Sequence, residues 1–323
     1  MYRKISAIVI PTLLAAGIIA WMLFNIRDDL VQSLELIVPA YLVVAILICL
    51  AAWILRGWRY HSILKSLGYS IGVLVSTACI FVSQTVNLVV PARLGDFVRV
   101  FILKHDYNTT YSEGVSSLVV ERVFDIFTVA LLGAISVLFV LNAPSWFYTI
   151  ILIPLLAGIG FFIFLIFIGK FSTTNRYIAI ILTMLHEIRK ASLSTKAIVL
   201  LGSSSIVIWL LDVLVCVSVV HMFGQEIPLA VIVLAIVIGN LVKAVPLTPG
   251  GIGTYEFALA ATFLLVGVAP AIATLIAVID HLVKNLVTLA GGIVSIYYFG
   301  DWVIPSIKEA LNSKLGGGTQ PEP

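Results

Sequence analysis

Long apolar stretches alternate with short polar connections along the whole chain. Stretches long enough to cross a bilayer occupy residues 5–24, 36–55, 115–141, 146–168, 197–220 and 271–299. A membrane-crossing helix needs about 20 such residues, so we predict an all-α integral membrane protein with about six full transmembrane helices. We expect a single membrane domain over residues 1–315 and a disordered polar tail over residues 316–323.

Two further apolar stretches, residues 71–104 and 229–267, are interrupted by prolines and glycines in the segments VPARLG and AVPLTPGGIGTYE. No water is present inside a bilayer to satisfy broken backbone hydrogen bonds, so irregular backbone is tolerated there only where it is buried or lines a cavity. We therefore predict two interrupted or re-entrant segments beside a polar site, which gives eight or nine hydrophobic segments in total.

The two interruptions share a short pattern. Val90-Pro91-x-x-x-Gly95 and Val245-Pro246-x-x-x-Gly250 each follow an apolar run that contains the tripeptide NLV. Broken helices at corresponding places in two halves of a chain are typical of transporters built from inverted repeats. We therefore consider an inverted repeat.

The lysines and arginines predict an orientation, because basic residues gather in cytoplasmic loops. If residues 71–104 form a re-entrant hairpin from the cytoplasmic side, both termini are cytoplasmic. Arg56, Arg59 and Lys65 then belong to a cytoplasmic loop, and so do the basic residues of segment 169–196. The count leaves open whether residues 229–267 form a second hairpin or two full spans. We place the protein in the plasma membrane.

Composition supports the membrane assignment, since 61% of the residues are hydrophobic and only 11% are charged, against about 25% charged in soluble domains. A charge at the centre of a bilayer costs about 2.5–3.5 kcal/mol, and such residues normally face the protein interior and pair. Five acids lie in or beside the apolar stretches: Glu121, Asp125, Asp212, Glu256 and Asp280. We interpret Asp212 as a satisfied core residue without a functional role.

The segment ERVFD contains two acids and one base, Glu121, Arg122 and Asp125. Spacings of three and four place Arg122 beside Asp125 on one helix. The second acid then needs a cation from elsewhere, and we consider Arg93, Arg99 and Lys243, which lie in the interrupted segments. Alternatively, the segment is a helix end whose long side chains reach the interface.

Two other acids have local explanations. Asp280 precedes Lys284 by four residues, the favoured order for an intrahelical pair, which either neutralises itself or serves a functional site. Glu256 falls in the first turn of a helix that Thr254 can cap, near the positive end of the helix dipole. It is either a coupling acid or a helix stabiliser, and the glycine-flanked amides there can also hold a phosphate.

Catalytic motifs are weak in this sequence. The five histidines are scattered without the spacing of metal ligands, and no phosphate-binding loop of the G-x-x-x-x-G-K-[ST] type is present. We therefore expect no metal site, no cofactor and no enzymatic activity. One enzymatic alternative stays open, in which Glu121 and Asp125 hold magnesium and a pyrophosphate.

Three segments in order, VPARLGDFVRVFIL, VVERVFD and AVPLTPGGIGTYE, resemble the signatures of the lysylphosphatidylglycerol synthase transmembrane-region family, also called the flippase-like domain. Its members resemble the membrane half of the multiple peptide resistance factor, which is associated with moving aminoacylated phosphatidylglycerol between leaflets. Others occur beside polyprenyl-linked glycan pathways. The matching positions are Pro91, Arg93, Gly95, Asp96 and Arg99; Glu121, Arg122 and Asp125; and Pro246, Pro249, Gly250, Gly251, Gly253 and Glu256.

The resemblance implies a function and a set of site residues. We expect a stand-alone member without the aminoacyl-transferase domain, which moves a glycerophospholipid or a polyprenyl-phosphate carrier between leaflets. The expected substrate-binding residues are Arg93, Arg99, Arg122, Lys243, Gly250, Gly251 and Gly253. The expected charge network consists of Asp96, Glu121, Asp125, Glu256, Asp280 and Lys284.

Two other functions are alternatives, a scaffold for a lipid-modifying or glycosyl-transfer enzyme and an integral-membrane lipid-phosphate enzyme. The expected partners are membrane lipids with anionic head groups and no nucleic acid. A second copy of the chain or a lipid-modifying enzyme is the protein partner that we consider.

Overall fold

The computed structural model describes residues 2–90, 92–140, 143–300 and 302–305. Pro91 of the first motif and the predicted tail over residues 316–323 lie outside this described part. Twelve α-helices account for most of the described residues, and no strand occurs among them. The predicted all-α class is confirmed.

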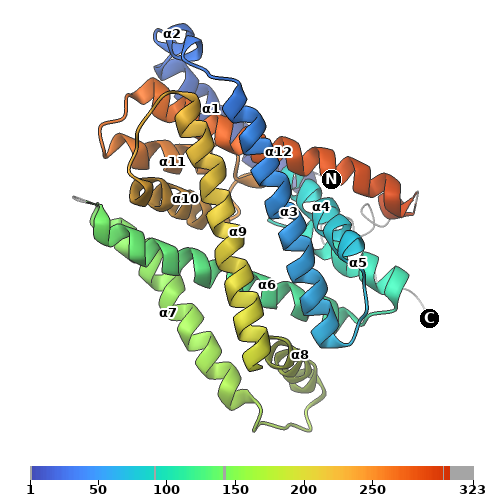
Figure 1. Ribbon diagram of the computed structural model, residues 1–323. Coiled ribbons are helices and arrows are strands. Elements are labelled where there is room, and N and C mark those ends of the chain that lie inside the picture. Colours follow the sequence, from blue (N-terminus) through green and yellow to red (C-terminus); the bar gives the residue numbers. More distant parts are fainter. Residues whose placement is uncertain (1, 91, 141–142, 301, 306–323) are drawn as a thin grey trace.

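The helices follow one another with short connections (Figure 1). They are α1 (Tyr2–Asn25), α2 (Leu30–Glu35), α3 (Ala40–Leu67), α4 (Val73–Val89), α5 (Asp96–Tyr107), α6 (Tyr111–Ser136), α7 (Ser145–Ile168), α8 (Arg176–Ser192), α9 (Thr195–Met222), α10 (Leu229–Ala244), α11 (Thr254–Leu264) and α12 (Pro270–Phe299). Two 3₁₀ turns, η1 (Val137–Phe139) and η2 (Pro249–Gly251), complete the described elements.

Five helices of the described part are long and apolar enough to cross a membrane, namely α3, α6 with η1, α7, α9 and α12. They correspond to five of the six predicted spans. The sixth falls on α1, whose described apolar portion, Val9–Asn25, has fewer than 18 residues. The apolar helices α4 and α10 have 17 and 16 residues, or about 24–26 Å at 1.5 Å per residue. Neither spans a hydrocarbon core of about 30 Å by itself.

Helix α3 is longer than the sequence predicted, and this changes the interpretation of two arginines. The apolar run ends at Leu55, but the helix continues to Leu67. Arg56 and Arg59 therefore lie within a helix of the bundle, and their assignment to a cytoplasmic loop was wrong. The helix continues because acids from other helices neutralise these arginines, as described below.

The order of helix lengths in the first half recurs in the second. A 28-residue helix, a short apolar helix, a break, a second short helix and a long helix form the series α3–α6, and the same order forms α9–α12. The leading helices α3 and α9 lie side by side through the middle of the molecule (Figure 1). The order of helix lengths is thus repeated, as the two short motifs indicated. Its inversion across the membrane stays a prediction.

Proline explains where both short helices end. Val90 follows α4, Val245 follows α10, and each precedes a proline and has extended backbone torsions. The ring of a proline disfavours the helical conformation of the preceding residue and supplies no N–H. Beyond the second break, α11 begins at Thr254 with Gly253 as its N-cap, and the Glu256 carboxylate accepts the Gly253 N–H at 2.7 Å. Glu256 thus lies in the first helical turn as predicted, but Gly253 and not Thr254 is the cap.

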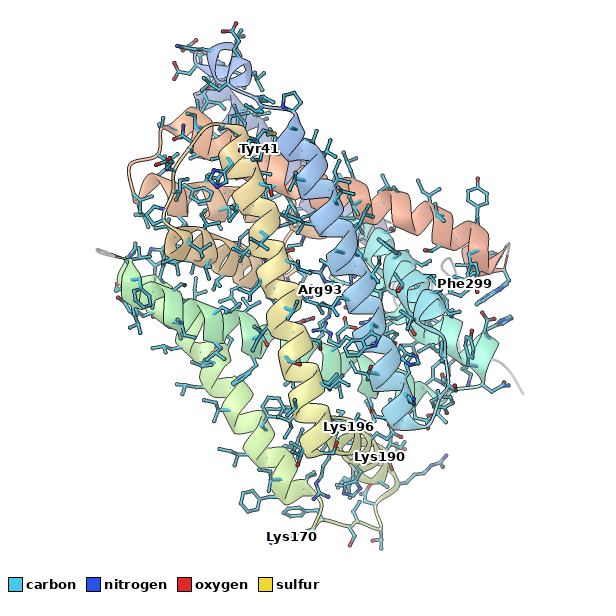
Figure 2. All side chains as sticks on the ribbon, viewed as in Figure 1. Tyr41, Arg93, Lys170, Lys190, Lys196 and Phe299 are labelled. Carbon is cyan, nitrogen blue, oxygen red and sulfur yellow. The ribbon has the colours of Figure 1, made fainter. Side chains whose placement is uncertain are left out.

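The predicted connection over residues 169–196 contains helix α8. Asn175 caps this helix by accepting the backbone N–H groups of Tyr177 and Ile178. Lys170, Lys190 and Lys196 gather at one end of the bundle, far from Tyr41 at the other end (Figure 2). Such clustering is what the positive-inside rule requires of one membrane face. Which face is cytoplasmic stays a prediction.

Small residues hold α4 in the bundle. Gly57 of α3 and Gly291 and Gly292 of α12 face the side chains of α4 so closely that an added Cβ would overlap Thr77, Phe81 and Thr85. Close approach at small residues is the usual means of helix packing inside membranes, where burial from water supplies no driving force. The position of α4 matters because its last turn leads into the first break.

Replacing Gly292 by alanine tests this packing. The new Cβ would collide with Thr85, a branched side chain whose hydroxyl donates to the Thr288 carbonyl. Overpacking of this kind costs about 1–3 kcal/mol, so we expect Gly292→Ala to lower the melting temperature in detergent. Gly202→Ala in α9, where an added Cβ meets no atom within 4 Å, is the control and should not lower it. Equal melting of the two variants would contradict the packing described here.

Candidate functional site

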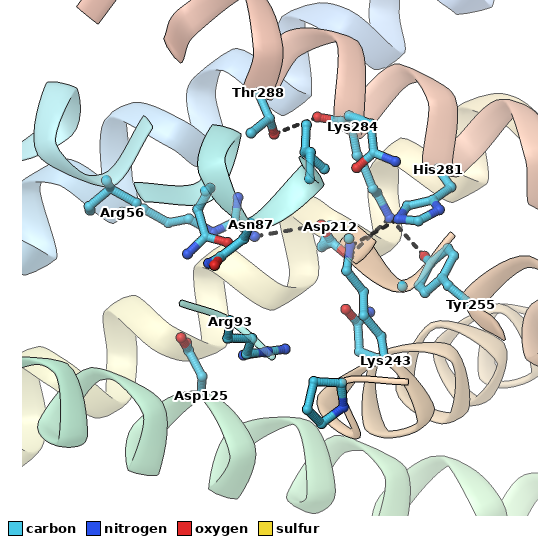
Figure 3. A pocket seen from close by; sticks show the side chains of 18 of the residues that line it. Arg56, Asn87, Arg93, Asp125, Asp212, Lys243, Tyr255, His281, Lys284 and Thr288 are labelled. Carbon is cyan, nitrogen blue, oxygen red and sulfur yellow. Dashed lines mark hydrogen bonds and ion pairs between the residues drawn. The ribbon is translucent and has the colours of Figure 1, made fainter. Parts of the chain in front are cut away.

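A polar cavity lies where the two breaks meet the long helices. Its volume is about 170 Å³, and its wall comes from α3, α4, α6, α9, α10, α11, α12 and both interrupted loops (Figure 3). Six basic side chains line it (Arg56, Arg59, Arg93, Arg122, Lys243 and Lys284), against three carboxylates (Glu121, Asp125 and Asp212). The lining is therefore cationic. Trp53 and Trp209 form part of the same wall.

The first buried ion pair joins α3 to α6. Arg59 is 1% exposed and binds both carboxylate oxygens of Asp125, at 2.6 and 3.0 Å. Ser205 of α9 accepts a further hydrogen bond from Arg59, and Trp209 donates its indole N–H to Asp125 at 3.2 Å. A two-point guanidinium–carboxylate contact is the strongest kind of ion pair in proteins. It fixes α3, α6 and α9 relative to one another.

A second pair joins the first interrupted segment to α6. Arg99 of α5 is completely buried, and it binds Glu121 with both terminal nitrogens at 2.9 and 3.3 Å. Its guanidinium also lies over the ring of Tyr60 at 4.6 Å. Arg99 was one of three cations considered for ERVFD, and the structure pairs it with Glu121. Because it does not line the cavity, direct substrate contact is not the role that its position supports.

Asp96 organises the first break. It accepts hydrogen bonds from Ser83, Gln84 and Asn87 of α4, at 3.1, 3.2 and 2.9 Å. Arg122 of α6 binds it at 3.1 Å. One carboxylate thus connects α4, α5 and α6. Arg122 was expected to pair with Asp125 on its own helix, but Asp125 is bound by Arg59, so Arg122 turns to Asp96.

A third group of charges lies on the opposite wall. Lys284 of α12 contacts Asp280 at 2.9 Å and Asp212 of α9 at 3.0 Å. Arg56 approaches Asp212 at 3.6 Å, and the Tyr255 hydroxyl donates to Asp280 at 2.7 Å. The predicted pair of Asp280 and Lys284 is present. Asp212, assigned no functional role from the sequence, lines the cavity and is the acid that Lys284 shares with Arg56.

A chain of three side chains from α10, α12 and α11 lies beside the second break. Lys243 Nζ lies 2.9 Å from His281 Nε2, and His281 Nδ1 lies 2.7 Å from a Glu256 carboxylate oxygen. His281 is completely buried and Glu256 nearly so. His281 also packs against the ring of Tyr255, with the ring centroids 4.4 Å apart. His281 was missed from the sequence, where it carried no motif.

Arg93 differs from the other arginines of the site. It lines the cavity, yet its guanidinium makes no hydrogen bond or ion pair with any residue that the structure describes. It lies near mid-height of the bundle and between Asp125 and Lys243 (Figures 2 and 3). Ala92 and Arg93 both have positive φ angles, 63° and 53°. Such conformations cost non-glycine residues about 1–3 kcal/mol each and concentrate at functional sites.

The glycines of the second break shape the same cavity. Gly250 and Gly251 line it with φ angles of 60° and 77°. An added Cβ on Gly251 would come within 2.5 Å of Lys243 Cγ, so this glycine leaves room for the lysine stem. Gly253 points elsewhere, since its added Cβ would meet Ala15 and Ile18 of α1. Gly253 therefore supports packing and the cap of α11, not the cavity wall.

The charges of the site do not cancel. We define the polar cluster as His281 together with seven basic residues and six acids. The basic residues are Arg56, Arg59, Arg93, Arg99, Arg122, Lys243 and Lys284, and the acids are Asp96, Glu121, Asp125, Asp212, Glu256 and Asp280. With His281 neutral, one positive charge is in excess. Within the described residues, Arg93 is the member without a partner. An uncompensated cation inside a bilayer is costly, so the cavity favours an anion.

The magnesium alternative fits poorly with these contacts. Glu121 and Asp125, the carboxylates that would hold the metal, are each bound by a guanidinium at two points. A cation in the same place would have to displace Arg99 or Arg59 from a buried site. Removing one partner of such a pair leaves a buried unpaired charge, which costs several kcal/mol.

The family described as the lysylphosphatidylglycerol synthase TM region matches residues 8–292. The chain belongs to this family. Among curated proteins, Glycosyltransferase AglD of Haloferax volcanii is 33% identical over 319 residues, which cover 84% of this chain and 51% of that protein. The chain thus spans about half the length of this relative.

Two further relatives of this chain carry only descriptive names. A UPF0104 membrane protein of Methanothermobacter thermautotrophicus is 21% identical, over 86% of this chain and 89% of its own length. The UPF0104 membrane protein MJ1078 of Methanocaldococcus jannaschii is 30% identical, over 54% of this chain and 76% of its own. No solved structure matches the chain significantly.

One expectation is corrected by these matches. The sequence, with scattered histidines and no catalytic motif, was interpreted as that of a protein without enzymatic activity. The similarity to a protein named as a glycosyltransferase, over most of this chain, contradicts that interpretation.

The ion pair between Arg59 and Asp125 should dominate the stability of the site. Arg59→Met leaves Asp125 buried without a cation, at a cost of about 3–5 kcal/mol, so we expect a large fall in the melting temperature in detergent. Arg56→Met is the matched control in the same helix. It should cost less, because Asp212 keeps Lys284 at 3.0 Å. Equal melting of the two variants would show that Asp125 does not depend on Arg59.

Proposed function

We propose that this protein binds a lipid with an anionic phosphate head group in its polar cavity and moves that head group between leaflets. The observation that carries the proposal is the excess positive charge of the cavity. Arg93 has no partner among the described residues, and it faces a space that Lys243 and Arg122 also line. A phosphate supplies the missing negative charge and accepts bidentate contacts from a guanidinium.

The architecture agrees with movement of a lipid head group through the cavity. The cavity is bounded by two broken helices, and broken helices near mid-membrane are a common location of transporter substrate sites. The head group would enter the polar cavity while its acyl or polyprenyl chains stay in the surrounding lipid. Both glycerophospholipids and polyprenyl-phosphate carriers have this chemistry. Cytoplasmic termini and a plasma-membrane location belong to the same proposal.

A second candidate follows from the relative named Glycosyltransferase AglD. In this alternative the cavity holds a lipid-linked sugar phosphate during glycosyl transfer, either as part of the reaction or as a scaffold beside the enzyme. The two candidates share the phosphate site and differ in the product. Transfer releases or attaches a sugar, whereas translocation changes only the leaflet in which the lipid lies.

Substitution of Arg93 by lysine tests the phosphate contact. Lysine keeps the charge but not the planar two-point geometry. We expect Arg93→Lys to slow leaflet exchange of a labelled anionic lipid in proteoliposomes by about tenfold, the effect of ~1.4 kcal/mol, without lowering the melting temperature. Arg176→Lys, the same exchange at an exposed position of α8, should leave the rate unchanged.

The same vesicles separate the candidates. Acceleration of leaflet exchange by the wild-type protein, lost in Arg93→Lys, supports translocation. Release of sugar from a lipid-linked sugar phosphate, without leaflet exchange, would favour the glycosyl-transfer alternative. If Arg93→Lys exchanges lipid at the wild-type rate, Arg93 does not hold the phosphate and the proposed site is wrong.

A further inference from the structure

Lys243 is the cation of the polar cluster that faces a neutral ring. Arg59, Arg99, Arg122, Arg56 and Lys284 each contact a carboxylate, at distances between 2.6 and 3.6 Å. Lys243 instead contacts His281 Nε2 at 2.9 Å. Lysine is also the basic side chain that gives up its proton when buried, whereas arginine stays protonated. Lys243 can therefore change between a charged ammonium and a neutral amine, whereas the arginines of the cluster stay charged.

The hydrogen bonds that link Lys243, His281 and Glu256 are complete for two different arrangements of the protons. In the first, the Lys243 ammonium donates to Nε2, and the Nδ1–H of His281 donates to the Glu256 carboxylate. In the second, Nε2–H donates to a neutral lysine, and protonated Glu256 donates to Nδ1. Each ring nitrogen acts once as donor and once as acceptor. The contacts of 2.9 and 2.7 Å serve both arrangements.

We propose that Lys243, His281 and Glu256 form an internal proton relay that sets the charge of Lys243 according to whether the cavity holds a phosphate. This inference rests on the proposed function and concerns the regulation of the same site. In the relay, the Lys243 N–H bond breaks as Nε2–H forms, and Nδ1–H breaks as the Glu256 O–H forms. Ammonium and carboxylate become amine and carboxylic acid, so protons and net charge balance without an outside donor.

The surroundings explain why occupancy controls the relay. Arg93 on the first break and Lys284 on α12 are like charges that act on Lys243, as do the opposite charges of Glu256 and of Asp212 on α9. Arg122 and Asp125 of α6 and Arg56 of α3 line the same cavity, and the ring centroid of Tyr255 of α11 lies 5.5 Å from Lys243 Nζ. Without an anion, unpartnered Arg93 opposes a charged Lys243. A phosphate between them stabilises both cations.

The relay has a mechanical consequence. The empty cavity loses one positive charge from its wall, while Glu256 loses its negative charge nearby. Charges are costly in a low-dielectric medium, and neutralising a pair lowers that cost. The empty protein can thus rearrange without carrying an unpaired ammonium. Because the proton moves within the protein, leaflet exchange needs no proton from either side of the membrane.

The tautomer of His281 reports the relay directly. We propose ¹⁵N NMR of histidine-labelled protein in detergent, with and without saturating farnesyl phosphate, a single-chain lipid phosphate. The His281 signal is assigned by its loss in His281→Gln. Binding is followed separately by the fluorescence of Trp53 and Trp209, which line the cavity. We expect Nε2–H in the empty protein and Nδ1–H in the bound protein.

Two variants control the measurement. Lys243→Arg cannot release its proton, so His281 should stay in the Nδ1–H form with and without the lipid. If that variant does not fold, Glu256→Gln, which cannot take up the proton, should remove the tautomer change instead. Lys190→Arg on the exposed end of α8 should behave as wild type.

The outcomes separate the relay from the proposed function. Binding with an unchanged tautomer would overturn the relay and leave the phosphate site intact. Absence of binding would overturn the proposed function. In that case the empty protein still decides the relay, because Nδ1–H or a doubly protonated ring there contradicts it.

Discussion

Buried guanidinium–carboxylate pairs between helices are the interaction on which the rest of this structure depends. Arg59 with Asp125 and Arg99 with Glu121 join segments that are 66 and 22 residues apart in the chain. They permit α3 to continue beyond its apolar run, and they hold α5 against α6. Because these pairs consume the carboxylates of the site, they leave Arg93 without one. The same interactions that stabilise the bundle therefore create its excess positive charge.

The two interrupted segments supply what straight helices cannot. Each break brings irregular backbone to the same polar cavity, and the second break packs against the last turn of α4, where an added Cβ on Gly250 would meet Leu88 at 2.9 Å. Arg93 lies in the first break and Asp96 directly after it, while Lys243 and Glu256 lie on the helices before and after the second break. Broken backbone inside a membrane is tolerated where protein surrounds it. Here helices of both series, α3–α6 and α9–α12, surround the cavity that the two breaks line.

Local patterns in the sequence predicted the local features of this fold. Apolar length predicted five of the spans, and the prolines and glycines within two apolar stretches predicted both breaks. Spacing of four residues predicted the pair of Asp280 and Lys284. Tertiary partners could not be predicted in this way. Arg59 followed an apolar run and looked like a loop residue, while His281 and the pairing of Arg122 with Asp96 depend on packing that no spacing reveals.

The central claim is that the cavity recognises a phosphate and not merely an apolar chain. Equilibrium binding of farnesyl phosphate and farnesol to the purified protein tests it most directly, with tryptophan fluorescence as the readout, since Trp53 and Trp209 line the cavity. The two ligands share one chain and differ in the head group. The account predicts saturable binding of farnesyl phosphate, with at least about tenfold weaker binding of farnesol (~1.4 kcal/mol). Equal affinities would contradict it, because the excess charge at Arg93 would then contribute nothing to recognition.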